Sequence, residues 1–277
     1  MTDYLDRPHD HRATAFASVY DEVSLWAARF GVLLLDHVPL SHGQRVLDLG
    51  CGNGFPLFEL AHMLGSSSRL WGADIWREGL ARARSKQEVY RLPNVGLAAA
   101  DGARLPFASA SFDLLVSNLG VNNFEDAPVV LAECARVAAP GAVLALTTNL
   151  EGHMAELYAT FRHVLEEIGN PVYLERLTAN EKHRGTREGL GTLLTDAGFT
   201  PSRAVGTTFT MRYTDGSALL RHSLTRFGFL GGWKAVVDEP DRRRVFAALE
   251  HHLNHHAEHE GELAMTIPAL YLEAVRP

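Results

Sequence analysis

The chain has 277 residues, a formal net charge of −7 and two cysteines. This length suits one large α/β domain with embellishments, or a core with a small cap. The acidic balance disfavours nonspecific nucleic-acid binding, which needs a basic surface. The cysteines form no disulfide framework, the polar N-terminus is unlike a secretory signal, and no apolar run approaches the roughly 20 residues that cross a bilayer. We therefore expect a cytoplasmic protein that binds neither nucleic acid nor membrane.

The first half of the chain alternates between strand and helix patterns. Residues 1–40 are expected to form a helical N-terminal cap that ends near Pro39. Strands are then predicted at residues 45–49, 69–75, 95–100, 112–117 and 142–147, and helices at 55–64, 78–90 and 127–137. The alternation predicts an α/β fold with a doubly wound, mostly parallel, Rossmann-like sheet whose core spans residues 41–150. Its ligand crevice should lie at the carboxyl ends of the strands.

The second half, residues 151–277, is expected to complete the sheet while adding helical inserts that cover the site. The inserts are predicted at residues 151–192 and 215–260, the second broken at Gly231-Gly232 and Pro240, and the two final strands at 202–213 and 265–275. The predicted sheet therefore has seven strands.

A glycine-rich turn follows the first predicted strand. Asp48 on the strand precedes Gly50, Gly52 and Gly54, which let the backbone turn sharply and approach a ligand closely. The dinucleotide fingerprint G-x-G-x-x-G would need a third glycine at Phe55. The observed G-x-G-x-G pattern suits a smaller ligand with a zwitterionic end better than a pyrophosphate. The alternative is a tight strand-to-helix turn that binds no ligand.

Two further acids stand at strand ends. Asp74 ends the second strand, 20 positions after Gly54, where a carboxylate can accept hydrogen bonds from both hydroxyls of a ribose. The alternative for Asp74 is an ordinary surface acid. Asp101-Gly102 ends the third strand, where the alternative is a simple turn, because Asp-Gly is a common turn pair.

Segment 46–54, in which apolar residues and an acid precede the glycine pattern, resembles the first motif of the class I S-adenosylmethionine-dependent methyltransferases. The resemblance is in particular to their type 11 or UbiE-like group. Segments 111–118 and 133–141 fit the same family. The resemblance spans about residues 45–149 and implies a Rossmann-like methyltransferase with S-adenosyl-L-methionine as cofactor. It also implies that Asp74 binds the ribose and that Asp101 accepts a hydrogen bond from the adenine amino group. We expect the cofactor to contact Tyr20, Asp48, Gly50, Gly52, Asn53, Asp74, Ile75, Asp101, Gly102 and Asn118.

A narrower resemblance links the chain to malonyl-carrier-protein O-methyltransferases, which esterify a free carboxylate. It is carried by segments 117–120, 146–148, 156–157, 213–215 and 265–267. The chain departs from that family at Val121-Asn122-Asn123, where the family tends to show an aromatic residue after Gly120. The acidic net charge also offers no obvious docking face for an acidic carrier protein.

The reaction expected is methyl transfer to a small-molecule acceptor at oxygen, either a carboxylate or a hydroxyl; a carrier-protein-bound acyl substrate is a further option. Methylation at nitrogen or carbon, a nicotinamide oxidoreductase and a nucleotide-sensing module without turnover are the alternatives. Asn118 and Asn122 follow the fourth strand, where the methyl group should emerge, and His153 follows the fifth. These three are the predicted catalytic residues, and the Tyr20 phenol could bond either ligand.

Two groups of basic residues are weaker candidates for a functional site. His251, His255 and His259 recur at helical spacing, as do His252 and His256, but a solvated helix face explains both sets, so we expect no metal. Lys182, Arg184 and Arg187 could clamp an anionic substrate or form a solvated face.

Overall fold

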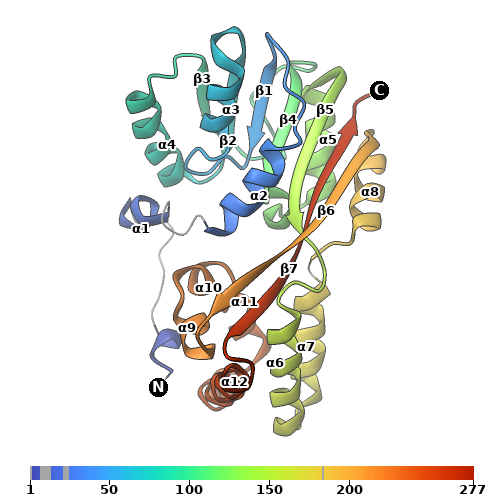
Figure 1. Ribbon diagram of the computed structural model, residues 1–277. Coiled ribbons are helices and arrows are strands. Elements are labelled where there is room, and N and C mark those ends of the chain that lie inside the picture. Colours follow the sequence, from blue (N-terminus) through green and yellow to red (C-terminus); the bar gives the residue numbers. More distant parts are fainter. Residues whose placement is uncertain (1, 7–13, 21–24, 183) are drawn as a thin grey trace. The chain divides into compact units, whose positions relative to one another are not determined.

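The computed structural model describes residues 2–6, 14–20, 25–182 and 184–277, arranged in two compact units (Figure 1). The sheet unit comprises Asp10–Thr148, Thr186–Gly206 and Ala269–Pro277. The helical unit comprises Met1–His9, Asn149–Gly185 and Thr207–Pro268. Part of the predicted N-terminal cap, residues 7–13 and 21–24, lies outside the described residues.

The seven strands lie in the order β3-β2-β1-β4-β5-β7-β6. They are β1 Arg45–Leu49, β2 Arg69–Asp74, β3 Val95–Ala99, β4 Phe112–Asn118, β5 Ala138–Asn149, β6 Thr200–Tyr213 and β7 Leu263–Val275. The pairs β1–β2, β1–β4, β2–β3 and β4–β5 are parallel. Backbone bonds from Gly141 to Arg276 and from Leu150 to Pro268 show that β5 and β7 run antiparallel. The mostly parallel, seven-stranded sheet predicted from the sequence is confirmed.

Helices cover both faces of the sheet, with α2 and α5 on opposite sides in Figure 1. The helices of this unit are α1 Thr14–Val19, α2 Leu25–Leu35, α3 Leu57–Leu64, α4 Arg77–Tyr90, α5 Ala127–Val137 and α8 Arg187–Asp196. Because side chains alternate along a strand, Leu114 and Val116 of β4 share one face, where they are buried with Leu34 of α2 and Leu57 of α3. This packing fixes the carboxyl ends of β1, β2 and β4 beside one another.

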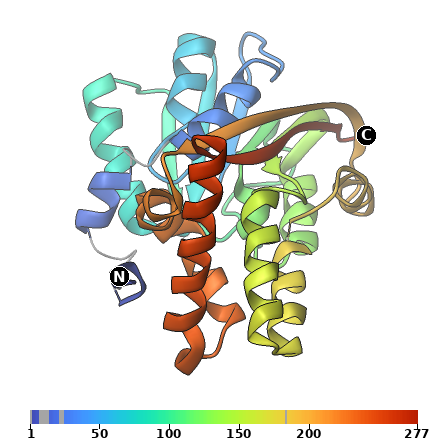
Figure 2. The same ribbon diagram turned by 60° about the horizontal axis from the view of Figure 1, so that its bottom comes forward.

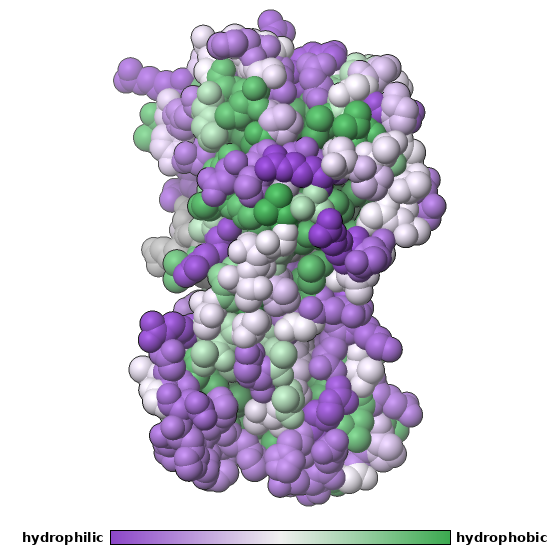
Figure 3. Space-filling model, turned by 45° about the vertical axis from the view of Figure 1, so that its right-hand side comes forward, coloured by the Kyte–Doolittle hydropathy of each residue, from purple (hydrophilic) through white to green (hydrophobic). Residues whose placement is uncertain are grey.

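The helical unit contains two long helices that run side by side, α6 Ala155–Ile168 and α12 Glu239–Glu260 (Figure 2). Its other helices are the 3-10 turn η1 Asp3–Asp6, α7 Pro171–Lys182, α9 Gly216–Arg221, α10 Ser223–Gly228 and α11 Leu230–Val236. Hydrophilic side chains gather over the helices of this unit, with apolar ones between them (Figure 3). None of the helices in the described part of the chain is long and apolar enough to span a membrane.

One of the two predicted breaks in the last insert was wrong. Gly231 and Gly232 lie inside α11, where burial of the neighbouring Trp233 outweighs the low helix propensity of glycine. The break predicted at Pro240 lies within a few residues of the observed one, since α11 ends at Val236 and α12 begins at Glu239. Pro240 lies in the first turn of α12, where a helix tolerates proline because the missing N–H would have no intrahelical partner.

Candidate functional site

The glycine loop after β1 adopts backbone angles that side chains disfavour. Gly50, Gly52 and Gly54 have φ values of 76°, 52° and 102°. A Cβ on Gly54 would lie 2.1 Å from Phe58 Cε2 of α3, so the turn also needs glycine for packing. A Cβ on Gly52 would meet nothing within 4 Å. The loop is therefore tightly packed at Gly54 and has open space at Gly52.

Asp74 ties the end of β2 to this loop. Its Oδ2 accepts a hydrogen bond from the Gly52 N–H at 2.7 Å, and its Oδ1 accepts one from the Trp76 N–H at 2.8 Å. Each carboxylate oxygen has a second lone pair, so the same group can accept further bonds from a pair of hydroxyls. Ile75, the next residue, is 73% exposed and offers an apolar surface beside the acid.

Asp48 is fully buried beneath the loop, and neither of its carboxylate oxygens has a hydrogen-bond partner among the described residues. Burial, with a smaller contribution from the Asp74 charge, raises the pKa of Asp48 to about 8, and the nearby Leu57 N–H partly opposes that rise. With this pKa the isolated acid is mostly protonated at pH 7, and a ligand that brings a cationic or donor group beside it would favour its ionised form. The site therefore fits a ligand with a positively charged end over the glycine loop.

The turn after β3 is held by α5. The Asp101 Oδ1 accepts a bond from the Ala103 N–H at 2.9 Å, so this acid does form the turn that its sequence predicts as an alternative. Glu133 of α5 accepts a bond from the Leu105 N–H at 2.8 Å, and Arg136 donates to the Phe107 carbonyl at 2.9 Å. The hydrogen bond from Arg136 lowers the pKa of Glu133, so the Glu133 carboxylate that holds this turn stays ionised.

The carboxyl end of β4 lies against the glycine loop. The buried Ser117 hydroxyl donates to the Leu49 carbonyl at 2.7 Å. A Cβ on Gly120 would lie 2.2 Å from that hydroxyl oxygen and 3.2 Å from the Leu49 carbonyl. Leu119 between them has φ 64°, an unusual value for a residue with a side chain. Such backbone strain persists only where the surrounding structure holds it in place, and it is frequent near ligand sites.

Both predicted asparagines at this end are held by hydrogen bonds. The Asn118 amide accepts from the Thr147 hydroxyl at 2.7 Å and donates to the Ala27 carbonyl of α2 at 3.0 Å. Asn122 accepts from the Thr148 hydroxyl at 2.6 Å. These bonds hold the two amides in fixed orientations, which suits groups that position a reactant.

Tyr20 belongs to an aromatic cluster beside Asp74, of which only the tyrosine was predicted from the sequence. Its ring centroid lies 5.1 Å from that of Trp76 and 5.7 Å from that of Phe16. Tyr20 is 36% exposed, and partial burial together with the Asp74 charge raises the pKa of its phenol. Trp76, two residues after the strand-end acid, is the signal that could have revealed the cluster.

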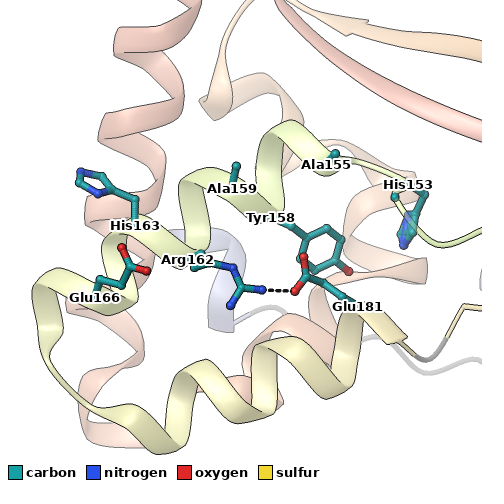
Figure 4. A pocket seen from close by; sticks show the side chains of 9 residues that line it. His153, Ala155, Tyr158, Ala159, Arg162, His163, Glu166 and Glu181 are labelled. Carbon is teal, nitrogen blue, oxygen red and sulfur yellow. Dashed lines mark hydrogen bonds and ion pairs between the residues drawn. The ribbon is translucent and has the colours of Figure 1, made fainter.

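The third predicted catalytic residue, His153, belongs to the helical unit. It lines a cavity of about 330 Å³ that also contacts Tyr158, Arg162 and Glu181 (Figure 4). The His153 ring is 2% exposed, and neither nitrogen has a partner among the described residues. Burial and, secondarily, the charge of Arg184 lower its pKa to about 4, so the imidazole is neutral at pH 7.

No sequence motif predicted this cavity. The Tyr158 hydroxyl donates to Asn180 at 2.9 Å and accepts from the Trp233 indole at 3.2 Å, linking α6, α7 and α11. In the predicted basic cluster, Arg184 belongs to this unit and is half-buried, whereas Lys182 and Arg187 are exposed. Burial lowers the pKa of Arg184.

Comparisons with known proteins agree with this geometry. The sequence model of a family described as a methyltransferase domain matches residues 47–146. Nocamycin O-methyltransferase of Saccharothrix syringae is 28% identical over 250 residues, which cover 86% of this chain and 88% of that enzyme. Malonyl-[acyl-carrier protein] O-methyltransferase of Halorhodospira halophila is 30% identical over 210 residues, 75% of this chain and 66% of the relative.

Demethylmenaquinone methyltransferase of a Geobacillus species is 30% identical over 176 residues, covering 60% of this chain and 75% of that enzyme. A solved structure, a SAM-dependent methyltransferase from Aquifex aeolicus, has the same fold, with a TM-score of 0.55 and 22% identity over 70% of this chain and 92% of its own. The chain belongs to the class I S-adenosylmethionine-dependent methyltransferases. It is an enzyme whose cofactor is S-adenosyl-L-methionine. This assignment replaces the alternative of a nicotinamide oxidoreductase.

Proposed function

We propose that this methyltransferase transfers the methyl group to an oxygen atom, carboxylate or hydroxyl, of a small-molecule acceptor. The observation that carries the proposal is the similarity to nocamycin O-methyltransferase, which extends over 86% of this chain and therefore far beyond the cofactor motifs. The similarity to a malonyl-[acyl-carrier protein] O-methyltransferase supports the same acceptor atom. A carrier-bound acyl group is a second form of acceptor for the same chemistry.

The cofactor supplies an electrophilic methyl group, and the protein contributes alignment and the exclusion of water. An ionised carboxylate is already a nucleophile and needs no base, whereas a hydroxyl does. His153 is neutral at pH 7 and keeps one lone pair, but a pKa of about 4 makes it a weak base. A carboxylate acceptor is therefore the simpler form of the proposal, because its methylation needs no general base from the protein.

The cofactor roles proposed for the sheet unit follow from its hydrogen bonds. We infer that Asp74 receives the ribose hydroxyls, since it is already fixed by Gly52 and Trp76. Asp48 and the glycine loop would hold the cationic amino-acid end. The adenine would lie between Ile75 and the turn of Asp101 and Gly102. Asn53, in the turn between Gly52 and Gly54, would contribute its backbone.

In the sheet unit, the residues proposed to contact the acceptor are Asn118, Asn122 and Tyr20. The two amides would orient the acceptor without titrating, because their side chains are held by Thr147 and Thr148. The Tyr20 phenol would bond the cofactor or the acceptor near Asp74. For His153, the proposed contribution is a substrate contact.

The deciding experiment is methyl transfer from methyl-labelled S-adenosylmethionine to a panel of carboxylic acids, phenols, amines and a malonyl thioester on an acyl carrier protein. A labelled product whose methyl carbon resonates as an O-methyl group in NMR supports the proposal. Release of the label as methanol under mild base separates a methyl ester from a methyl ether. Transfer only to nitrogen or carbon would replace oxygen by one of the alternatives.

A further inference from the structure

Two histidines and a carboxylate meet on the surface where the paired helices α6 and α12 of the helical unit run side by side (Figure 2). His163 and Glu167 lie four residues apart on α6, so they share one face of that helix. His252 comes from α12. Phe161 of α6 and Phe246 of α12 also pack against each other, with ring centroids 5.7 Å apart, and this contact holds the two helices together.

Two distances from Glu167 to the histidines of this triad are close to those between ligands around an ion. Glu167 Oε1 lies 3.4 Å from His163 Nε2, and Glu167 Oε2 lies 3.5 Å from His252 Nε2. Both separations exceed a normal hydrogen bond of about 2.7–3.2 Å. Tetrahedral ligands bound at about 2.0–2.1 Å stand about 3.3–3.4 Å apart, which is close to both values. All three ligand atoms lie within 4.8 Å of one another.

We propose that His163, Glu167 and His252 bind a divalent transition-metal ion of the zinc type that clips α6 to α12. Two imidazoles and one carboxylate form a donor set that zinc, nickel and cobalt prefer, whereas magnesium and calcium prefer oxygen ligands. Water can complete the coordination, because the side chains of His163, Glu167 and His252 are 58%, 52% and 33% exposed.

The proposal concerns stability rather than methyl transfer. His163 also lines the cavity of the helical unit, and in Figure 4 it lies beside α12 at the opposite end from His153. A bound ion would cross-link residues far apart in the sequence and oppose separation of the two helices. The predicted set His251, His255 and His259 is different, since no such group forms from it among the described residues.

The test is binding of zinc to the full-length, tag-free, metal-stripped protein, measured by calorimetry and by thermal unfolding. We expect one zinc ion per chain and a Tm increase of about 2–8 °C, with little effect of magnesium. Glu167→Gln and His252→Gln should each weaken zinc binding at least 10-fold. The matched control His255→Gln/His259→Gln, on the same helix, should bind zinc like the wild type.

Cobalt gives an independent readout of geometry. Cobalt bound to the wild type should show visible absorption bands of low-symmetry tetrahedral or five-coordinate type, and these should disappear in His252→Gln. Zinc binding unchanged in both Glu167→Gln and His252→Gln would overturn the proposal, and so would equal binding of zinc and magnesium. In either case the triad is only an ion pair between a carboxylate and imidazoles.

Discussion

The sheet unit and the helical unit build their candidate binding residues in different ways. In the sheet unit, the acids and glycines stand at the ends of adjacent parallel strands, so residues 48–54 and Asp74 meet because of the strand order. In the helical unit, the cavity is lined by one face of α6 and by Glu181 of α7, and it depends on how helices pack. Short motifs therefore identify the first site, whereas the second has no local signature.

Because of this difference, we expect the largest effect in the sheet unit from a substitution that changes the backbone of the glycine loop. Gly54→Ala forces a side chain into φ 102° and places its Cβ 2.1 Å from Phe58. We expect a loss of roughly 2–4 kcal/mol in the free energy of unfolding and no measurable cofactor binding by calorimetry. Gly43→Ala is the matched control, since Gly43 also has positive φ but open space around it. Normal cofactor affinity in Gly54→Ala would show that the loop tolerates another conformation.

The next largest effect is expected at Asp74. Asp74→Ala should weaken S-adenosylmethionine binding by roughly 1.5–3 kcal/mol, because charged hydrogen bonds to the ribose would be lost. The control is Asp113→Ala, which removes an exposed pair with Arg45 at the opposite end of β1. Calorimetry that gives the same dissociation constant for Asp74→Ala and wild type would remove the ribose assignment.

The contrast also explains what the sequence could predict. Short apolar runs located the strands that are buried on both faces of the sheet, and alternating apolar residues located the strands that are buried on one face. The bracing of the turn after β3 by Glu133 and Arg136 was not predicted, since its hydrogen bonds join residues about 30 apart in sequence. The break predicted at Gly231 was wrong because tertiary packing outweighs residue propensity, whereas the one at Pro240 lies close to the observed start of α12. The burial of His153 without hydrogen-bond partners could not be predicted from the sequence, because burial depends on how the helices pack.

A smaller effect, on turnover rather than on binding, is expected at the end of β4. Asn118→Ala, Asn122→Ala and Tyr20→Phe should lower kcat by roughly 10-fold while changing the cofactor dissociation constant less, because they orient reactants. Asn94→Ala is a control amide, since the Asn94 side chain donates to the carbonyls of Gly65 and Ser68. Wild-type turnover in all three variants would place the acceptor elsewhere, with His153 and the basic residues Arg184 and Arg187 as the next candidates.

In the helical unit, the buried imidazole should make stability depend on pH. The pKa of His153 is about 4 in the folded protein and about 6.5 when unfolded, so the unfolded state binds the proton first. Stability should therefore fall as pH decreases from about 6.5 towards 4, by about 1–3 kcal/mol from this residue. Urea unfolding of His153→Phe should show a weaker pH dependence than wild type, whereas His259→Gln should match wild type. Parallel pH profiles for wild type and His153→Phe would mean that the histidine has a solvated, protonated form.

The smallest effect expected on activity is that of metal removal, and it separates the two units most directly. Displacement of a methyl group by an ionised nucleophile needs no Lewis acid, so turnover should survive exhaustive treatment with EDTA. The triad of the helical unit, by contrast, should lose its ion under the same treatment, with a lower Tm as the result. Measuring both quantities on one sample distinguishes a structural ion from a catalytic one. Loss of turnover, restored by zinc at a temperature where the protein stays folded, would contradict the prediction and give the ion a part in methyl transfer.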